Sequence, residues 1–148
     1  MKDLAMLPRR SLLGLLLLAP TTGFARIFAE RGVALRGTDV VGYFTEGRVV
    51  RGQAQHAAEW GGVRWHFANA ENRARFLAEP SAFAPAYGGF CAWAVSQGYT
   101  APTDPAAWRI VDGRLFLNYD QNIQRRWERD IPGFIALGDT NWPRLSRG

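Results

Sequence analysis

The chain has a single cysteine, Cys91, and only two histidines, His56 and His66, in 148 residues. One cysteine cannot form an internal disulfide, so the fold must be held by its core alone. Thiolate and imidazole are also the donors that soft metal ions prefer, and a chain with so few of them can build only a small, partly open site. The possible ligands of a soft metal ion are therefore limited to these three side chains and a neighbouring carboxylate.

Short catalytic motifs are absent as well. There is no Gly-Xaa-Ser-Xaa-Gly elbow, no Cys-Xaa-Xaa-Cys pair, no phosphate-binding loop and no pair of carboxylates at catalytic spacing. A Cys–His hydrolase built on Cys91 would need an activated thiol and a third, orienting group, and the sequence identifies neither. The sequence therefore favours a binding module over an enzyme.

Lysine is nearly missing, because Lys2 is the only one and every other basic residue is arginine. The 18 basic and 13 acidic residues give a formal net charge of +5. The arginines are scattered or interleaved with acids, as in the segment 125–130. A nucleic-acid interface needs a basic stripe with aromatic residues for stacking. The sequence shows none, so nucleic acid is not a predicted partner.

The first 25 residues have the three parts of an export signal. Pro8-Arg9-Arg10-Ser11 ends a charged start, Leu12–Ala19 is apolar, and small residues lead to Ala25. The apolar run is too short to span a bilayer. Arg9-Arg10 before Ser-Leu-Leu-Gly resembles the twin-arginine signal, with an ordinary Sec signal or an uncleaved anchor as alternatives. We predict cleavage after Ala25, a periplasmic location, one domain over residues 26–148 and no stable membrane insertion after cleavage.

Two β-hairpins are predicted, over residues 55–67 and 108–118. The first turns at Gly61-Gly62 and the second at Asp112-Gly113, both two-residue sequences typical of tight hairpins. Side chains alternate across a strand, so the first turn fixes which residues share its apolar face: Trp60, Val63, Ala58, Trp65, His56 and Phe67. This register points His56 into the core and leaves His66 on the polar face.

Helices are predicted between and after the hairpins. Asn69 caps a helix that Pro80 ends. A second helix is predicted over residues 87–97, which would place Tyr87 and Cys91 on one stripe. Further helical segments follow the second hairpin. Two hairpins interleaved with short helices predict a small, single α+β domain.

A family resemblance runs through these elements. Trp65-His66-Phe67 is followed by Phe76, Pro80 and Phe83, and residues 87–98 read Tyr-Gly-Gly-Phe-Cys-Ala-Trp-Ala-Val-Ser-Gln-Gly. The first pattern resembles the YHS domain, and the second is similar to a block in its longer, exported bacterial members. The likeness covers about residues 33–142. It implies association with a metal, because short YHS modules occur with copper and other heavy-metal transporters and with metal-dependent oxygenase components.

The metal ligands that the resemblance leads one to expect are missing. In the metal-associated form, cysteines follow the aromatic strand and recur four residues later, where this chain has Ala68 and Asn72. A further cysteine belongs near the start of the domain, where this chain has Asp39-Val40-Val41. The resemblance therefore implies the fold without the thiolates that a soft metal needs.

Cys91 with His56 is the predicted metal centre, with His66 or Asp39 as a further ligand of a copper or zinc ion. The segment that carries Cys91 is expected to pack on the hairpin face that presents His56. The protein would then be a periplasmic metal-binding or metal-handling module without turnover. The alternative is that Cys91 is a buried core residue and His56 a hydrogen-bonded histidine at a strand end.

Aromatic residues support a second hypothesis, from another class. Tyr43, Tyr87, Trp93 and Tyr99 would line a cleft that binds a small molecule or a protein partner, unless they only fill the core. A thiol-dependent redox role for Cys91 is a third hypothesis. Beyond a metal ion or a small ligand, the sequence identifies neither a partner nor an oligomeric state.

Overall fold

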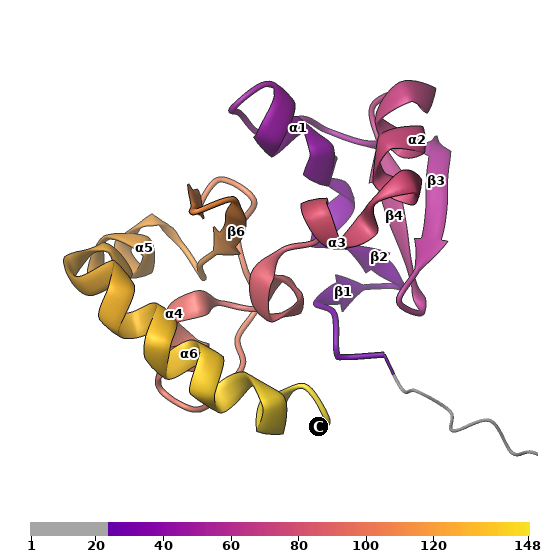
Figure 1. Ribbon diagram of the computed structural model, residues 1–148. Helices are drawn as coiled ribbons and strands as arrows, with labels where there is room; N and C mark the ends of the chain where they lie inside the picture. The colour runs from indigo at the N-terminus through magenta and orange to yellow at the C-terminus, as the bar shows by residue number, and fades with distance from the viewer. Residues whose placement is uncertain (1–23) are drawn as a thin grey trace, which may run out of the picture.

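The computed structural model describes residues 24–148, which fold into one mixed α+β domain with two separate sheets. The predicted export signal lies outside the described residues, except for its last two positions. Figure 1 shows two halves, one formed by residues 24–83 and the other by residue 92 onward. The predicted fold class and both predicted hairpins are confirmed.

The N-terminal half is built on a four-stranded sheet with the strand order β1-β2-β4-β3. β1 (Ala29–Glu30) and β2 (Val33–Ala34) form a short hairpin. β3 (Gln53–Trp60) and β4 (Val63–Phe67) form the long hairpin that the sequence predicts. β2 pairs with β4 in parallel, so the short hairpin extends the edge of the long one.

The register of the long hairpin breaks before it reaches His56. The pairs next to the turn are as predicted, but Phe67 pairs with Gln53 rather than with His56. Residues 54–56 therefore form a bulge. They lie between Gln53 and Ala57 of β3, whose partners Phe67 and His66 are neighbours on β4. The predicted pairing of His56 with Phe67 is wrong, because the alternation of side chains does not continue through a bulge.

Short helices pack against this sheet, and the core beneath them is aromatic. Phe76 lies with its ring centroid 5.0 Å from that of Trp65 and 5.1 Å from that of Phe67, and all three rings are buried. Asn69 caps the helix that carries Phe76, as predicted. The helical elements of this half are η1 (Leu35–Gly37), α1 (Val40–Thr45), α2 (Ala70–Ala78) and α3 (Pro80–Phe83).

The C-terminal half consists of a two-stranded sheet and four helical segments around a second core. Its longest helix, α6, packs along α4, as Figure 1 shows. Within residues 24–148, no helix is both long and apolar enough to cross a membrane. The elements are α4 (Ala92–Ser96), β5 (Trp108–Val111), β6 (Arg114–Leu117), α5 (Gln121–Trp127), η3 (Glu128–Asp130) and α6 (Ile131–Leu145).

The helix predicted over residues 87–97 is shorter than expected. A short 3-10 segment, η2 (Ala86–Gly89), comes first, and within it Tyr87 has a φ of 57° and Gly88 a φ of 61°. These left-handed residues interrupt a right-handed helix. Cys91 is the N-cap of α4, so the predicted stripe of Tyr87 and Cys91 on one helix is wrong.

The segment after the predicted cleavage site straps the two halves together. The amide of Arg26 donates to the carbonyl of Ser146, 3.1 Å away, and the amide of Phe28 donates to the carbonyl of Gly88 at 2.9 Å. Residues 26–28, which we call the N-terminal strap, thus bind the connection between the halves and the end of α6. The chain just after the predicted cut is part of the fold.

Candidate functional site

An aromatic crevice of about 190 Å³ lies where the two halves meet. Trp60 and Trp65 line it from the N-terminal half, and Tyr87 and Trp142 line it from the C-terminal half. Residues 24–27 close one side. Pockets of this kind, apolar with few polar groups and placed between structural units, are where proteins most often hold small ligands.

The two tryptophans of the crevice owe their position to the tight turn of the long hairpin. Trp60 ends β3 and Trp65 lies in β4, so the turn brings their rings to 5.8 Å in an edge-to-face arrangement. The indole N–H of Trp65 donates to the backbone carbonyl of Trp60 at 3.0 Å. Because this polar atom is already bonded, Trp65 can contact an apolar ligand without leaving a donor unpaired.

Tyr87 is fixed by a polar network on the opposite wall. Its hydroxyl lies 3.0 Å from Oδ1 of Asp139 and 3.3 Å from the carbonyl oxygen of Ile135. Asp139 in turn accepts two hydrogen bonds from the guanidinium of Arg114, at 2.9 and 3.1 Å. Burial, and then the neighbouring Asp139, raise the pKa of Tyr87 far above its ordinary value. The Arg114 guanidinium holds the pKa of Asp139 below its ordinary value, so the tyrosine stays a neutral donor.

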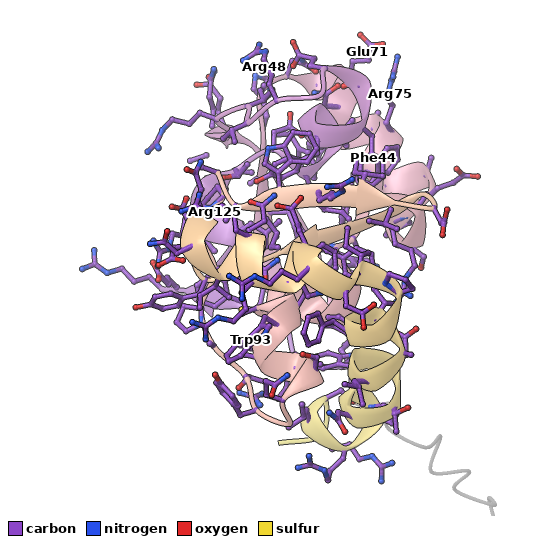
Figure 2. The ribbon with its side chains drawn as sticks, turned by 90° about the vertical axis from the view of Figure 1, so that its left-hand side faces the viewer. Phe44, Arg48, Glu71, Arg75, Trp93 and Arg125 are labelled. Carbon is purple, nitrogen blue, oxygen red and sulfur yellow. The ribbon has the colours of Figure 1, made fainter. Side chains whose placement is uncertain are left out.

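The other three predicted cleft residues lie elsewhere. Tyr43 is buried and donates its hydroxyl to the carbonyl of Pro105 at 2.7 Å. Trp93 and Tyr99 meet edge to face, with ring centroids 6.4 Å apart, and Figure 2 shows Trp93 below Arg125 of α5, far from Phe44 of the other half. Of the predicted set, only Tyr87 lines the crevice.

The structure also separates the predicted metal ligands. His56 is half-buried in the bulge of β3, whereas Cys91 is buried at the start of α4. Figure 1 shows β3 and α4 on opposite sides of the molecule. His66 lines a different hollow, next to Arg51. Within residues 24–148, no three His, Cys, Asp or Glu side chains are grouped so as to hold a metal ion.

Cys91 lies in the core, and its sulfur atom has two hydrogen-bond partners. Its Sγ lies 3.5 Å from Oδ1 of Asn118 and accepts a hydrogen bond from the amide of Tyr119 at 3.3 Å. Only 1% of the residue is exposed. Burial raises the pKa of the thiol above its ordinary value, which lowers the fraction of reactive thiolate.

Cys91 should therefore resist thiol reagents in the native protein. We expect a disulfide reagent to label it roughly a hundredfold more slowly, or slower still, than in urea, because labelling requires local opening of the core. Absorbance of the released thiolate measures the rate. A Ser81→Cys variant, exposed on α3, is the control and should label at once at its new thiol. Equal labelling rates for Cys91 in buffer and in urea would contradict its burial in the core and would favour the redox hypothesis.

Asp39 is a buried hydrogen-bond centre, whereas the sequence identifies it as a candidate metal ligand. Its Oδ1 accepts from the amide of Val41 at 2.9 Å, as an N-cap should. Its Oδ2 accepts from the amide of Ala68 and from the side-chain amide of Asn72, both at 2.8 Å. Asp39 thus joins α1, the end of β4 and α2.

The partners of Asp39 are the positions where the YHS resemblance leads one to expect cysteines. Ala68 and Asn72 converge on the carboxylate from the strand end and from the helix, and Asp39 lies in the region where the third cysteine is expected. Both carboxylate oxygens already accept hydrogen bonds, one at Oδ1 and two at Oδ2. A hydrogen-bond network centred on a carboxylate lies where the resemblance leads one to expect thiolates.

Comparisons with known proteins identify no relative of this chain. No family model, no curated protein and no solved structure matches the chain. The YHS resemblance and the metal association that it implies stay predictions.

Proposed function

We propose that the protein is an exported binding domain that holds a small, largely apolar aromatic ligand in the crevice between its halves. The observation that carries the proposal is the wall of the crevice, where indole and phenol rings from three separate segments surround a space that neither core fills. This is the cleft hypothesis from the sequence with a corrected set of lining residues.

The size of the crevice limits the ligand. An apolar cavity of about 150 Å³ holds one benzene ring, so the crevice, at about 190 Å³ with Phe24 and Ala25 in place, has room for at least one ring with a substituent or for a compact fused pair. A ligand of that size gains roughly 0.3–1.5 kcal/mol per non-hydrogen atom. We therefore expect a weak to moderate dissociation constant, on the order of 10–1000 μM.

One charged group lines the crevice and would favour a ligand with a polar substituent. Arg26 lines it with its side chain stacked on Phe90, the guanidinium carbon 5.0 Å from the ring centroid. Its Nη1 also donates to the carbonyl of Leu145 at 3.3 Å. A guanidinium keeps several donors in a fixed plane, so a ligand whose hydroxyl or carboxylate reaches beyond the crevice to this group would gain a partner there.

Cleavage of the predicted export signal would enlarge the crevice. Phe24 and Ala25 line it, and both precede the predicted cut after Ala25. Phe24 is 70% exposed, so its removal costs the core little. The new ammonium group on Arg26 would lie beside the carbonyl of Ser146, at the C-terminal end of α6, where a positive charge is favourable. The mature chain should bind the ligand better than a chain that keeps residues 24–25.

Fluorine NMR of a fluoroindole probe tests the proposal on the mature chain, residues 26–148. We expect saturable line broadening with the wild type, and its loss in Ala84→Phe, because residue 84 lines the crevice and the added ring fills it. Leu137→Phe, at a position that is 51% exposed on α6, is the matched control and should bind the probe normally.

Three outcomes decide between the hypotheses. No broadening with the wild type, or equal broadening with Ala84→Phe, would overturn the crevice proposal. Binding that a chelator abolishes and that needs Cys91 would favour the metal hypothesis instead. Equal affinity of chains that begin at residues 24 and 26 would contradict only the role assigned to cleavage.

A further inference from the structure

A second hollow, of about 430 Å³, opens beside the short hairpin and has a different character from the crevice. Arg31, Arg36 and Arg51 line it together with His66, and Glu30 is its only carboxylate. Glu30 forms an ion pair with Arg36, with 3.2 Å between the carboxylate oxygen and Nε. Among the described residues, neither Arg31 nor Arg51 has a carboxylate within ion-pairing distance, so two guanidinium charges remain uncompensated.

The backbone holds these side chains in a defined arrangement. Thr38 and Arg51 form an isolated antiparallel bridge, and the amide of Gly52 donates to the carbonyl of Gly37 at 2.8 Å. A Cβ added to Gly52 would lie 2.6 Å from the Cβ of His66, so these two segments are in close contact. The cationic groups come from three chain segments that are hydrogen-bonded to each other or tightly packed.

Two of the arginines lie where backbone geometry disfavours them. Arg31 has a φ of 51° and Arg36 a φ of 53°, two of only five non-glycine residues with positive φ in the described part of the chain. Arg31 begins the two-residue turn between β1 and β2, a position that prefers Asn, Asp or Gly. A left-handed arginine is strained. A side-chain role would explain why an arginine stands in a turn that asparagine suits better.

We propose that this hollow, the arginine hollow, binds a small oxyanion such as a phosphate group. Guanidinium groups present paired donors that match the oxygens of phosphate, and the bonds are charge-assisted. The imidazole of His66 adds a further donor when its ring N–H faces the anion. The phosphate can be a free ion or the headgroup of a lipid, since both offer the same oxygens. The proposal is independent of the crevice and of its ligand.

The test uses the Arg31→Asn variant, which should raise the stability of the protein and lower its affinity for phosphate. Asn suits the left-handed turn position, so the melting temperature should rise by roughly 2–4 °C. The same change removes a guanidinium, so affinity for inorganic phosphate should fall about tenfold. NMR titration at constant ionic strength, with chloride as the balancing salt, measures the affinity through the amides of Gly32, Gly37 and Gly52.

Arg129→Asn is the matched control, because it removes the same charge from the exposed surface of the other half. It should leave phosphate affinity within twofold. Equal loss in both variants, or shifts spread over the whole chain without saturation, would overturn the proposal. A second arm replaces phosphate with phosphatidylglycerol vesicles: Arg31-dependent binding to vesicles alone would assign the headgroup as the source, and binding to neither would overturn the site.

Discussion

Replacing Asp39 with alanine should lower the free energy of unfolding by about 3–5 kcal/mol. Asp39 is fully buried, and its carboxylate accepts three hydrogen bonds from two backbone amides and one side-chain amide. Alanine would leave these donors without partners, and each unpaired buried donor costs about 1–3 kcal/mol. Urea unfolding followed by circular dichroism measures the change, and it should appear in the midpoint with little change in the slope.

Asp120→Ala is the control for this prediction. Asp120 caps α5 through a single hydrogen bond, from the amide of Ile123 at 2.8 Å, so its loss should cost only about 1 kcal/mol. Asp39→Asn should fall between the two, since an amide keeps one acceptor oxygen but turns an N–H toward one of the donors. Equal costs for Asp39→Ala and Asp120→Ala would show that Asp39 is no more than a helix cap.

The Asp39 network also bears on the metal hypothesis. The YHS resemblance leads one to expect thiolates at the positions of Ala68 and Asn72 and in the region of residues 39–41, and the structure joins Ala68 and Asn72 to Asp39 by hydrogen bonds. A carboxylate with three amide partners joins α1, β4 and α2. The other two predicted ligands, Cys91 and His56, belong to α4 and β3, which Figure 1 shows on opposite sides of the molecule.

The elements predicted correctly are those that local sequence determines. The turns at Gly61-Gly62 and Asp112-Gly113 predict both hairpins, because a two-residue turn fixes the register of the strands next to it. Asn69 marks the start of α2 because a side-chain oxygen can satisfy the free amides of a first turn. Each signal acts within a few residues, so no tertiary contact can easily override it.

The errors arise where distant contacts decide. The helix expected over residues 87–97 is interrupted because Tyr87 takes a left-handed conformation, with its hydroxyl bonded to Asp139 of α6. His56 does not pair with Phe67 as expected, because residues 54–56 form a bulge. Neither the strain at Tyr87 nor the bulge has a local sequence signature, since both are set by packing against other segments.

The crevice could be predicted only in part for the same reason. The pair Trp60 and Trp65 is visible in the sequence, because a tight turn at residues 61–62 places both near the hairpin end. Trp142 lies more than seventy residues later in the sequence. The N-terminal strap, residues 26–28, lies near the opposite end of the described chain. Their approach depends on how two hydrophobic cores dock, which periodicity does not encode.

Replacing Gly88 with alanine should cost about 3 kcal/mol or more and should also abolish binding in the crevice. Gly88 has a φ of 61°, and a Cβ there would overlap the backbone carbonyl oxygen of Arg26. Since backbone atoms cannot move aside as a flexible side chain can, the strap would have to leave its place. It would then lose the hydrogen bonds of Phe28 to Gly88 and of Arg26 to Ser146. Thermal unfolding gives the stability, and the fluoroindole titration gives the binding.

Gly47→Ala separates strain from steric overlap in this experiment. Gly47 has nearly the same φ, 63°, but nothing lies within 4 Å of a Cβ added there, so its variant should lose only the 1–2 kcal/mol of a left-handed alanine and keep full binding. If both variants lose the same stability, backbone strain alone explains Gly88. If Gly88→Ala loses more and hydrogen exchange at Phe28 accelerates with it, the strap is what ties the two halves together, because only its departure exposes that amide.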